Sequence, residues 1–460
     1  MQIDNFFIGI GGTGMSRLAL FMQKTGMRIA GSDRAYTPDT QHPQILRLIQ
    51  SGIPVFAQDG GGIGTHVKRI VISAAVEADN PELRIAESMG IPVITRSAAL
   101  AEIFNSLTGW GITGTSGKTT TTGMAAAAAR WCAVPHHLYA GDDLCGDSGE
   151  KITQDNRPLS TMICEIDESD GSPTLYHSDR LIITNISEDH KTIEELRTIF
   201  LTAAQQTHNE IILNADCVES CRLAGQLPNN KKATFGIGAN ADFRALNIER
   251  RPTGSAFTCN GTPYTLCVPG THNIYNALAV IALFVSAGLP EPDIARGLAG
   301  FRGMKRRLEL VAERGGIRIY DDYSHNPDKI AAALSTLKAH GGRVHWIFRP
   351  HGYGPMLLFR NELCRIARKV LDADDTVYML DIFDAGGTAK RTIHTTDLAK
   401  DFRASGLTVE YVSDPDRLPE QVAPRVRTGD TIVVMGARDP YLSRYARDIA
   451  SEVIGGKIGV

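Results

Sequence analysis

The chain has 460 residues, 43% of them hydrophobic and 22% charged, which is the ordinary composition of a globular protein. Its 48 lysines and arginines against 51 aspartates and glutamates give a net charge of −3, so no basic excess favours nucleic acid or a membrane surface as partner. The longest apolar run, residues 277–287, is far short of the roughly 20 residues that a membrane-spanning helix needs.

The cysteines indicate a reducing compartment. None of the eight forms a Cys-x-x-Cys pair, and several lie in apolar runs, where a small buried thiol is the simplest interpretation. The first residues carry no basic segment and pass directly into an apolar strand pattern, so the sequence predicts no export signal. We therefore expect reduced thiols and a cytoplasmic protein.

The first 107 residues alternate between strand and helix patterns. An apolar strand at 6–8 runs into a G-x-G-x-x-G turn at 9–14, and residues 15–24 show helical spacing. A second strand at 28–33 ends in Asp33, nineteen positions after Gly14, close to the spacing at which such an acid meets a ribose. With further strands expected at 67–73 and 92–95, this segment predicts a dinucleotide-type domain, although glycine-rich packing without a ligand remains the alternative.

A second phosphate-binding pattern lies at 111–120. An apolar strand leads to the turn Gly114-Thr115-Ser116-Gly117-Lys118-Thr119-Thr120, and a run of helix-forming residues follows. Glycines allow consecutive backbone N–H groups to converge on a phosphate, and the start of the helix adds its positive dipole end. Lys118 is expected to reach the outer phosphates and the Thr119 hydroxyl to bind Mg²⁺. The turn is a variant, because Ile112 occupies the first glycine position of G-x-x-x-x-G-K-[ST].

Two nucleotide-type sites in one chain narrow the choice of function. A hydride-transfer enzyme would use only the first site, and a simple ATPase would use only the second. A ligase that couples ATP to a nucleotide-carrying substrate uses both. An NAD-type reductase and a non-catalytic nucleotide-binding scaffold are the alternatives from other classes.

Acidic clusters follow two expected strands beyond the phosphate loop. Residues 160–170 form an apolar strand that ends in Glu165, Asp167, Glu168 and Asp170, and residues 180–190 form another that ends in Asp189-His190. Parallel strands end on the same side as the phosphate loop, where carboxylates and an imidazole can hold divalent cations. Strand-end capping and solvated charge are the alternative for any one of these acids.

The remainder of the chain predicts short strands and turns over 210–290, closed by the apolar helix at 277–287. A basic stretch at 301–309 suggests a domain border. Strands alternating with helices are then expected at 316–320, 344–348, 376–380, 409–412 and 431–435.

These motifs resemble the Mur ligase family across nearly the whole chain. The resemblance is carried by the phosphate loop, the acidic cluster at 165–170, Thr184-Asn185-Ile186 with Asp189-His190, Gly270-x-His272-Asn273-x-x-Asn276, Arg306-Arg307 and Asp321-Asp322-Tyr323-x-His325. It implies an α/β fold of three domains: a Rossmann-like UDP-binding domain (1–107), a P-loop ATPase domain with a central parallel sheet (108–298) and a C-terminal Rossmann-like α/β domain (299–460).

The resemblance also implies a reaction and its substrates. In this family ATP and Mg²⁺ drive amide formation during the cytoplasmic phase of peptidoglycan synthesis. A carboxylate attacks the γ-phosphate, and an amine then displaces phosphate from the resulting acyl phosphate. The N-terminal turn implies UDP-N-acetylmuramate as the acid, with L-alanine as the amine.

The site residues follow by motif position. Catalysis is assigned by resemblance to Lys118, Glu165, His190, Arg307 and His325, and metal binding to Thr119, Glu165 and His190. ATP binding is assigned to Gly114, Thr115, Ser116, Gly117, Lys118, Thr119, Thr120, His272, Asn273, Asn276, Arg307 and Asp322. Substrate binding is assigned to Gly11, Gly12, Thr13, Gly14, Met15, Asp33, Ser73, Arg96, Tyr323 and His325.

Three positions depart from the family pattern, and the third of them keeps the amine open. Ser116 stands where this branch has a histidine, and Asn326 stands where a second histidine is common. The segment Pro350-His351-Gly352-Tyr353-Gly354-Pro355 lacks the arginines that follow Pro-His in relatives and lie near the carboxylate of the incoming amino acid. A peptide or a different amino acid therefore remains an alternative amine.

Overall fold

The computed structural model describes residues 2–73, 76–77, 79–146, 160–188, 191–238, 240–251, 253–384 and 391–455. They form two compact units. The first unit holds the described residues within Met1–Gly141, Lys151–Ala245 and Tyr275–Gly297, and the second holds those within Asp142–Glu150, Leu246–Ile274 and Leu298–Val460.

The first sheet of the first unit is parallel, with strand order β3-β2-β1-β4-β5. Its strands are β1 (Asn5–Ile8), β2 (Ile29–Asp33), β3 (Val55–Ala57), β4 (Ile70–Ile72) and β5 (Val93–Thr95). Its helices are α1 (Thr13–Lys24), α2 (Pro43–Gln50), α3 (Pro81–Ser88) and α4 (Arg96–Asn105). The four strands expected from the sequence are confirmed, and β3 was not predicted.

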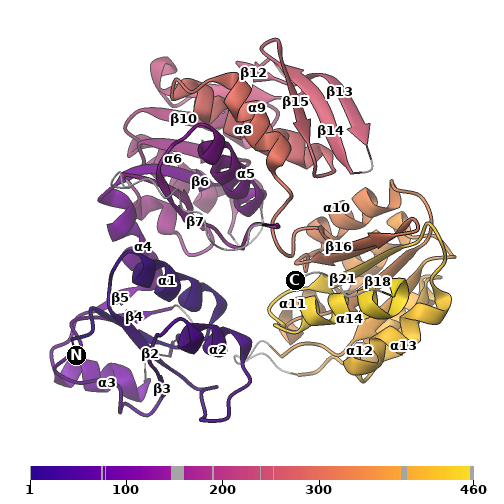
Figure 1. Ribbon diagram of the computed structural model, residues 1–460, viewed down its shortest axis with the longest axis horizontal. Coiled ribbons are helices and arrows are strands. Elements are labelled where there is room, and N and C mark those ends of the chain that lie inside the picture. Colours follow the sequence, from indigo (N-terminus) through magenta and orange to yellow (C-terminus); the bar gives the residue numbers. More distant parts are fainter. Residues whose placement is uncertain are drawn as a thin grey trace. The chain divides into compact units, whose positions relative to one another are not determined.

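Alternation along β1 explains why helices cover both faces of this sheet. Phe6 and Ile8 belong to one buried cluster with Ala86 of α3, whereas Phe7 belongs to another with residues of α1, α2 and α4. Successive side chains of a strand point to opposite faces, so a strand that is apolar throughout needs cover on each side. Figure 1 shows α1 and α3 on opposite sides of the sheet.

The second sheet of this unit is also parallel, with order β12-β11-β10-β9-β6-β8-β7. Its strands are β6 (Thr108–Thr113), β7 (His136–Tyr139), β8 (Thr161–Glu165), β9 (Arg180–Ile183), β10 (Glu210–Asn214), β11 (Lys232–Gly236) and β12 (Phe243–Arg244). The associated helices are α5 (Lys118–Trp131), α6 (Ile193–Gln205), α7 (Val218–Ala224), α8 (Thr271–Ser286) and α9 (Glu291–Gly300). The predicted order of strand, phosphate loop and helix is confirmed by β6 and α5.

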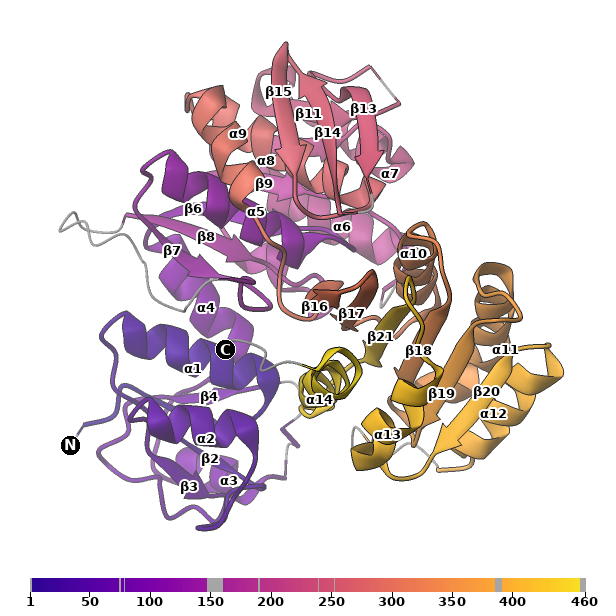
Figure 2. The same ribbon diagram turned by 45° about the vertical axis from the view of Figure 1, so that its right-hand side comes forward.

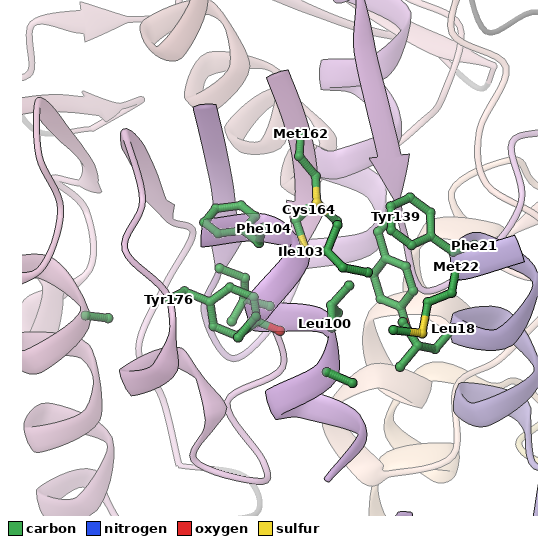
Figure 3. Packing of buried hydrophobic residues seen from close by; sticks show 14 of the residues in the cluster. Leu18, Phe21, Met22, Leu100, Ile103, Phe104, Tyr139, Met162, Cys164 and Tyr176 are labelled. Carbon is green, nitrogen blue, oxygen red and sulfur yellow. The ribbon is translucent and has the colours of Figure 1, made fainter. Parts of the chain in front are cut away.

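The two sheets of the first unit share one hydrophobic cluster. The ring of Phe21 in α1 meets that of Tyr139 in β7 edge to face, with centroids 5.5 Å apart. Phe104 of α4 packs in the same way against Tyr176, at 5.2 Å. Figure 3 shows these side chains with Met162 and Cys164 of β8 between the two pairs of rings. This packing fixes the glycine-rich turn before α1 relative to the carboxyl ends of the second sheet.

The second unit contains a small antiparallel sheet and a larger mixed sheet. The antiparallel sheet, which lies in the region where the sequence predicted short strands and turns, has strands β13 (Leu246–Arg251), β14 (Gly254–Cys259) and β15 (Thr262–Leu266). The larger sheet has order β16-β17-β21-β18-β19-β20, and its pairs are parallel except for β16 with β17. Its strands are β16 (Glu309–Arg314), β17 (Ile317–Asp322), β18 (Val344–Arg349), β19 (Thr376–Leu380), β20 (Thr408–Val412) and β21 (Thr431–Gly436).

Helices also cover both faces of the larger sheet, as Figure 2 shows. Val433 and Met435 of β21 pack with residues of α10 (Pro327–Lys338), α11 (Tyr353–Val370) and α12 (Thr395–Ala404). Ile432 and Val434 point to the other face, toward α13 (Leu418–Val422) and α14 (Leu442–Ile454). The predicted α/β class is confirmed, whereas the predicted domain boundaries stay a prediction.

Two further features concern the cysteines and the helices. All eight cysteines lie in the described part of the chain and are free thiols. None of the described helices combines the length and apolar character that crossing a bilayer demands.

Candidate nucleotide and ligase site

The phosphate loop adopts a backbone that only glycine accommodates at two positions. Gly114 and Gly117 have φ of +124° and +86°. A Cβ on Gly114 would lie 2.2 Å from Thr184 Oγ1, and one on Gly117 would lie 2.6 Å from Asn276 Oδ1. Glycine is therefore required at both positions, because the turn has positive φ there and because Thr184 and Asn276 lie too close for a side chain. This contact also places Asn276, an expected ATP-binding residue, against the loop.

The segment after β9 braces the loop through backbone atoms. The Ser116 N–H donates to Asn185 Oδ1 at 3.0 Å, and Asn185 Nδ2 donates back to the Ser116 carbonyl at 2.9 Å. Thr184 Oγ1 donates to the same carbonyl at 2.7 Å. Thr115 Oγ1 donates to the Ser187 carbonyl at 3.0 Å. These bonds hold the loop rigid, which preorganised binding of a phosphate requires.

Lys118 is held at the first position of α5 by a buried acid. Its Nζ donates to Glu168 Oε2 at 2.5 Å and to the Gly114 carbonyl at 2.9 Å. The side chains of Lys118 and Glu168 are only 14% and 5% exposed. Burial lowers the pKa of Lys118, but the carboxylates of Glu168, Asp167 and Glu165 outweigh burial and raise it. The lysine is therefore a fixed positive charge at the loop.

Thr119 and Glu165, two predicted metal ligands, are in contact. Thr119 Oγ1 donates to Glu165 Oε1 at 2.8 Å, and the Gly141 N–H donates to Glu165 Oε2 at 2.5 Å. A hydroxyl and a carboxylate are the hard oxygen donors that Mg²⁺ prefers, so this pair fits a magnesium site. The third predicted ligand, His190, lies outside the described residues. Within the described ranges, no group of three His, Cys, Asp or Glu side chains converges on one point.

The glycine-rich turn before α1 and the acids after β8 share one cavity. Its wall includes Thr13 and Gly14 from the turn, Arg96 from the start of α4, and Gly141, Glu165 and Asp167 from the second sheet. Glu165 is the hydrogen-bond partner of Thr119 in α5. A ligand in this cavity would therefore contact the glycine-rich turn before α1 and also Glu165, which is hydrogen-bonded to the helix that follows the phosphate loop.

The turn itself is fixed by Asp33 and flanked by Arg96. Asp33 Oδ2 accepts from the Gly11 N–H at 2.7 Å, so the acid expected to meet a ribose supports the turn in this structure. A Cβ on Gly14 would lie 3.3 Å from Arg96 Nη1, which places the guanidinium directly against the turn. Arg96 also lies 3.6 Å from Asp170, at the end of the acidic cluster. Asp170 thereby links the first domain's arginine to the second sheet.

The other predicted substrate residues differ in exposure. Gly12 and Thr13 are exposed at the turn, and Ser73 directly follows β4 at the carboxyl edge of the sheet. Met15 is 3% exposed and packs in the hydrophobic cluster, so only its backbone is available to a ligand.

The start of α8 carries the remaining ATP residues predicted by motif. Asn273 is buried and donates from Nδ2 to the Pro269 carbonyl at 2.6 Å, which ties the helix start to the turn before it. His272 is exposed one position earlier. Thr120, in the first turn of α5 after the phosphate loop, is half-buried.

The second unit groups the residues predicted at its own sheet edge. Asp322 ends β17 and accepts from the Leu308 and Ser324 N–H groups, both at 2.8 Å. The Arg307 guanidinium lies 5.0 Å from the centre of the Tyr323 ring and 4.0 Å from Asp142. His325 packs edge to face on Tyr323, at 5.6 Å. These four residues lie in one cluster of the second unit, and their roles toward ATP and the substrates stay a prediction.

His351 joins this cluster although sequence reasoning gave it no role. Its ring packs edge to face on His325 with centroids 5.0 Å apart. Burial lowers the pKa of both histidines to about 4, so both rings are neutral at neutral pH. Glu168, Asp170 and Asn185 were likewise present in the quoted motifs without assigned partners, because a motif gives residue types and spacing but no contacts.

Comparison with known proteins places these motifs in a family. The model described as "Mur ligase family, catalytic domain" matches residues 6–107, the Mur ligase middle domain matches 112–284, and "Mur ligase, glutamate ligase domain" matches 306–438. A UDP-N-acetylmuramate–L-alanine ligase of Streptomyces avermitilis is 31% identical over 447 residues, covering 94% of each chain. The enzyme of the same name from Deinococcus radiodurans is 32% identical and covers 98% of this chain and 93% of its own.

Solved structures show the same fold. The UDP-N-acetylmuramate–alanine ligase of Thermotoga maritima superposes with a TM-score of 0.80 at 24% identity, covering 99% of this chain and 100% of its own. A murein peptide ligase of Psychrobacter arcticus gives 0.67 at 20% identity and covers both chains fully. Together with the family matches along the chain, these similarities show that the protein belongs to the Mur ligase family of ATP-dependent ligases.

Proposed function

We propose that the protein joins the carboxylate of UDP-N-acetylmuramate to L-alanine, with ATP and Mg²⁺, in the cytoplasmic synthesis of peptidoglycan precursors. The observation that carries the proposal is the cavity whose wall contains both the glycine-rich turn and Glu165. A UDP-linked acid bound at the turn would extend toward the Thr119–Glu165 pair beside the phosphate loop. The relatives named for this reaction support the identity of the two substrates.

The described residues suit the electrostatic problem of the reaction. In the activating step, a carboxylate attacks the terminal phosphate of ATP, and both groups are anions. The phosphoryl group passes from ATP to the carboxylate. Lys118, fixed at the start of α5, offsets their repulsion, and the start of the helix adds its dipole. Thr119 and Glu165, with His190, would hold Mg²⁺.

The other predicted roles stand as part of this proposal. Asn276 lies against Gly117 of the phosphate loop, as an ATP-binding residue would. His272, Asn273, Arg307 and Asp322 keep their predicted roles toward ATP. Tyr323 and His325 keep theirs toward the substrates.

Phosphate release tests the proposal directly. Purified protein with ATP, Mg²⁺ and UDP-N-acetylmuramate should release phosphate only when an amine is added, and L-alanine should give the highest kcat/KM of a panel of amino acids. Lys118→Ala should lower kcat by about 100-fold or more, since the transferring group loses its cation. Lys68→Ala, an exposed lysine of the same unit, is the matched control. Absence of turnover with every UDP-muramyl acceptor would reject the substrate assignment.

One observation supports a second amine. The segment from Pro350 to Pro355 at the start of α11 contains no arginine, and α11 exposes Leu357 and Leu358 to solvent. A peptide carrying apolar groups would suit this surface better than a small zwitterion. If a peptide with apolar side chains gave a higher kcat/KM than L-alanine, the ligase chemistry would stand and the amine assignment would change.

A further inference from the structure

We propose that Arg438 binds the carboxylate of the amine substrate and so selects an amino acid over a simple amine. The inference rests on the proposed ligase function and names a residue that no sequence motif indicated. It is carried by the backbone of Arg438, by its register in the sheet and by the pairing of the surrounding charges.

Arg438 has a backbone conformation that disfavours any side chain. Its φ is +64°, in the left-handed region where glycine is the usual residue. The turn after β21 is held in place by Asp439, which is 2% exposed and lies 3.2 Å from Arg349 Nε. Asp439 Oδ1 also accepts from the Tyr441 N–H at 2.9 Å. Strained residues that are over-determined by their surroundings are concentrated at functional sites, which directs attention to the side chain that this turn presents.

Arg438 follows the strand that lies between the two strands preceding His325 and His351. Strand β21 lies between β17 and β18, with Met435 paired to Asp322 and Gly436 paired to Arg349. His325 is three residues beyond Asp322, as Arg438 is three beyond Met435. His351 is two residues beyond Arg349, as Arg438 is two beyond Gly436. All three residues therefore follow the ends of adjacent strands within two or three positions, at the carboxyl edge where ligands of such sheets bind.

Within the described residues, the arginines near the two histidines are paired with carboxylates, whereas Arg438 is not. His325 and His351 are neutral, because burial lowers the pKa of each to about 4. Arg349 is paired with Asp439, Arg306 with Asp321, and Arg307 with Asp142. Arg438 is exposed, and in the described part of the chain no carboxylate lies within ion-pair distance of it. Burial is the main cause of the lowered pKa of His351, and the positive charge of Arg438 lowers that pKa further.

These features match the chemistry of an α-amino acid. A guanidinium binds a carboxylate through two parallel N–H···O bonds, which fix orientation as well as position. The neighbouring neutral imidazoles offer acceptor nitrogens to the amino group, which must lose its charge before it can attack an activated acid. Arg438 would therefore bind an amine that carries a carboxylate and contribute nothing to binding an amine that lacks one.

Kinetics of Arg438→Gly test the inference, because glycine removes the guanidinium and also fits the left-handed turn. The KM for the carboxylate-bearing amine that performs best in the panel should rise by about 10- to 100-fold, the loss expected for a charged hydrogen-bonded pair. The KM values for ATP and UDP-N-acetylmuramate should stay within about twofold. Arg438→Lys should be intermediate, and Arg447→Ala, an exposed arginine of α14, should behave as wild type.

Each other outcome overturns the inference. An unchanged KM for the amine would show that Arg438 does not bind it, and a raised KM for ATP would assign Arg438 to the nucleotide. A wild-type enzyme that turns over an amine without a carboxylate as well as the amino acid would also reject the role. None of these results affects the proposed function, which fails only if wild-type protein forms no amide with any UDP-muramyl acceptor. Arg438→Gly should melt at a higher temperature than Arg438→Ala, which keeps the strained backbone.

Discussion

The buried pair of Lys118 and Glu168 makes the sharpest prediction for stability. Their side chains are 14% and 5% exposed, with a separation of 2.5 Å. Lys118→Ala would leave the Glu168 carboxylate buried without its cation, and breaking a buried pair in this way costs about 3–5 kcal/mol of unfolding free energy. Lys68→Ala breaks a pair of similar length with Asp4, at 2.7 Å, but these side chains are 49% and 24% exposed. That substitution should cost about 1 kcal/mol or less.

Both lysines lie in the first unit, so one unfolding transition reports on both. The protein has three tryptophans, and in a Trp346→Phe background the remaining two, Trp110 and Trp131, belong to this unit. Urea denaturation followed by their fluorescence gives the midpoint for each variant. Adding Glu168→Gln to Lys118→Ala should recover most of the loss, because an amide needs no counter-charge.

The loss should also depend on pH in a defined direction. Burial raises the pKa of Glu168 and Lys118 opposes the rise, so Lys118→Ala should raise the pKa further. A carboxyl group with a raised pKa binds its proton more tightly in the folded state, so stability falls as pH rises through that pKa. The cost of Lys118→Ala should therefore be smaller at pH 5 than at pH 8. Equal midpoint shifts for Lys118→Ala and Lys68→Ala, or no recovery with Glu168→Gln, would refute the reasoning.

Three further predictions concern the turns and the histidine pair. The pKa of His351 is lowered to about 4, so this histidine binds a proton more readily in the unfolded chain than in the folded one, and the second unit should lose stability as pH falls from 6.5 to 4. His351→Gln should reduce this dependence of the unfolding free energy on pH, measured by urea titrations at several pH values. An unchanged pH dependence would contradict the prediction. Gly114→Ala should abolish phosphate release, because its Cβ would meet Thr184, whereas Gly52→Ala, also at positive φ but in open space, should only lower the melting temperature. Asp170→Asn should raise the KM for UDP-N-acetylmuramate about tenfold by releasing Arg96, with little change in the KM for ATP; equal effects on both substrates would show a general loss of structure.

Local pattern was sufficient for the elements that carry the chemistry. Apolar runs bounded by glycine predicted β1, β6 and β17, and the phosphate loop was expected between a strand and a helix, as observed. The short β3 was not predicted. For β13 to β15 the sequence predicted short strands in the region but neither their bounds nor their antiparallel pairing. Strand β13 is largely exposed, so it lacks the apolar signal that would mark its bounds.

Contacts between segments far apart in the chain could not be predicted from the sequence. Asp33 was expected to meet a ribose by its spacing, and in the structure it holds the Gly11 N–H. The capture of Lys118 by Glu168 depends on the pairing of β6 with β8, which fixes the phosphate loop beside the acidic cluster. A motif names these residues without saying which of them will lie within hydrogen-bond distance.

The sequence by itself determined the family, the α/β class and the positions of both glycine-rich turns, because these depend on residue type and spacing along a short stretch of chain. Only the tertiary structure decided that one cavity has both the first turn and Glu165 in its wall, and that Arg438, His325 and His351 follow the ends of adjacent strands. These relations arise when parallel strands from distant parts of the chain align their carboxyl ends, and sheet order and register are set by packing of the whole unit.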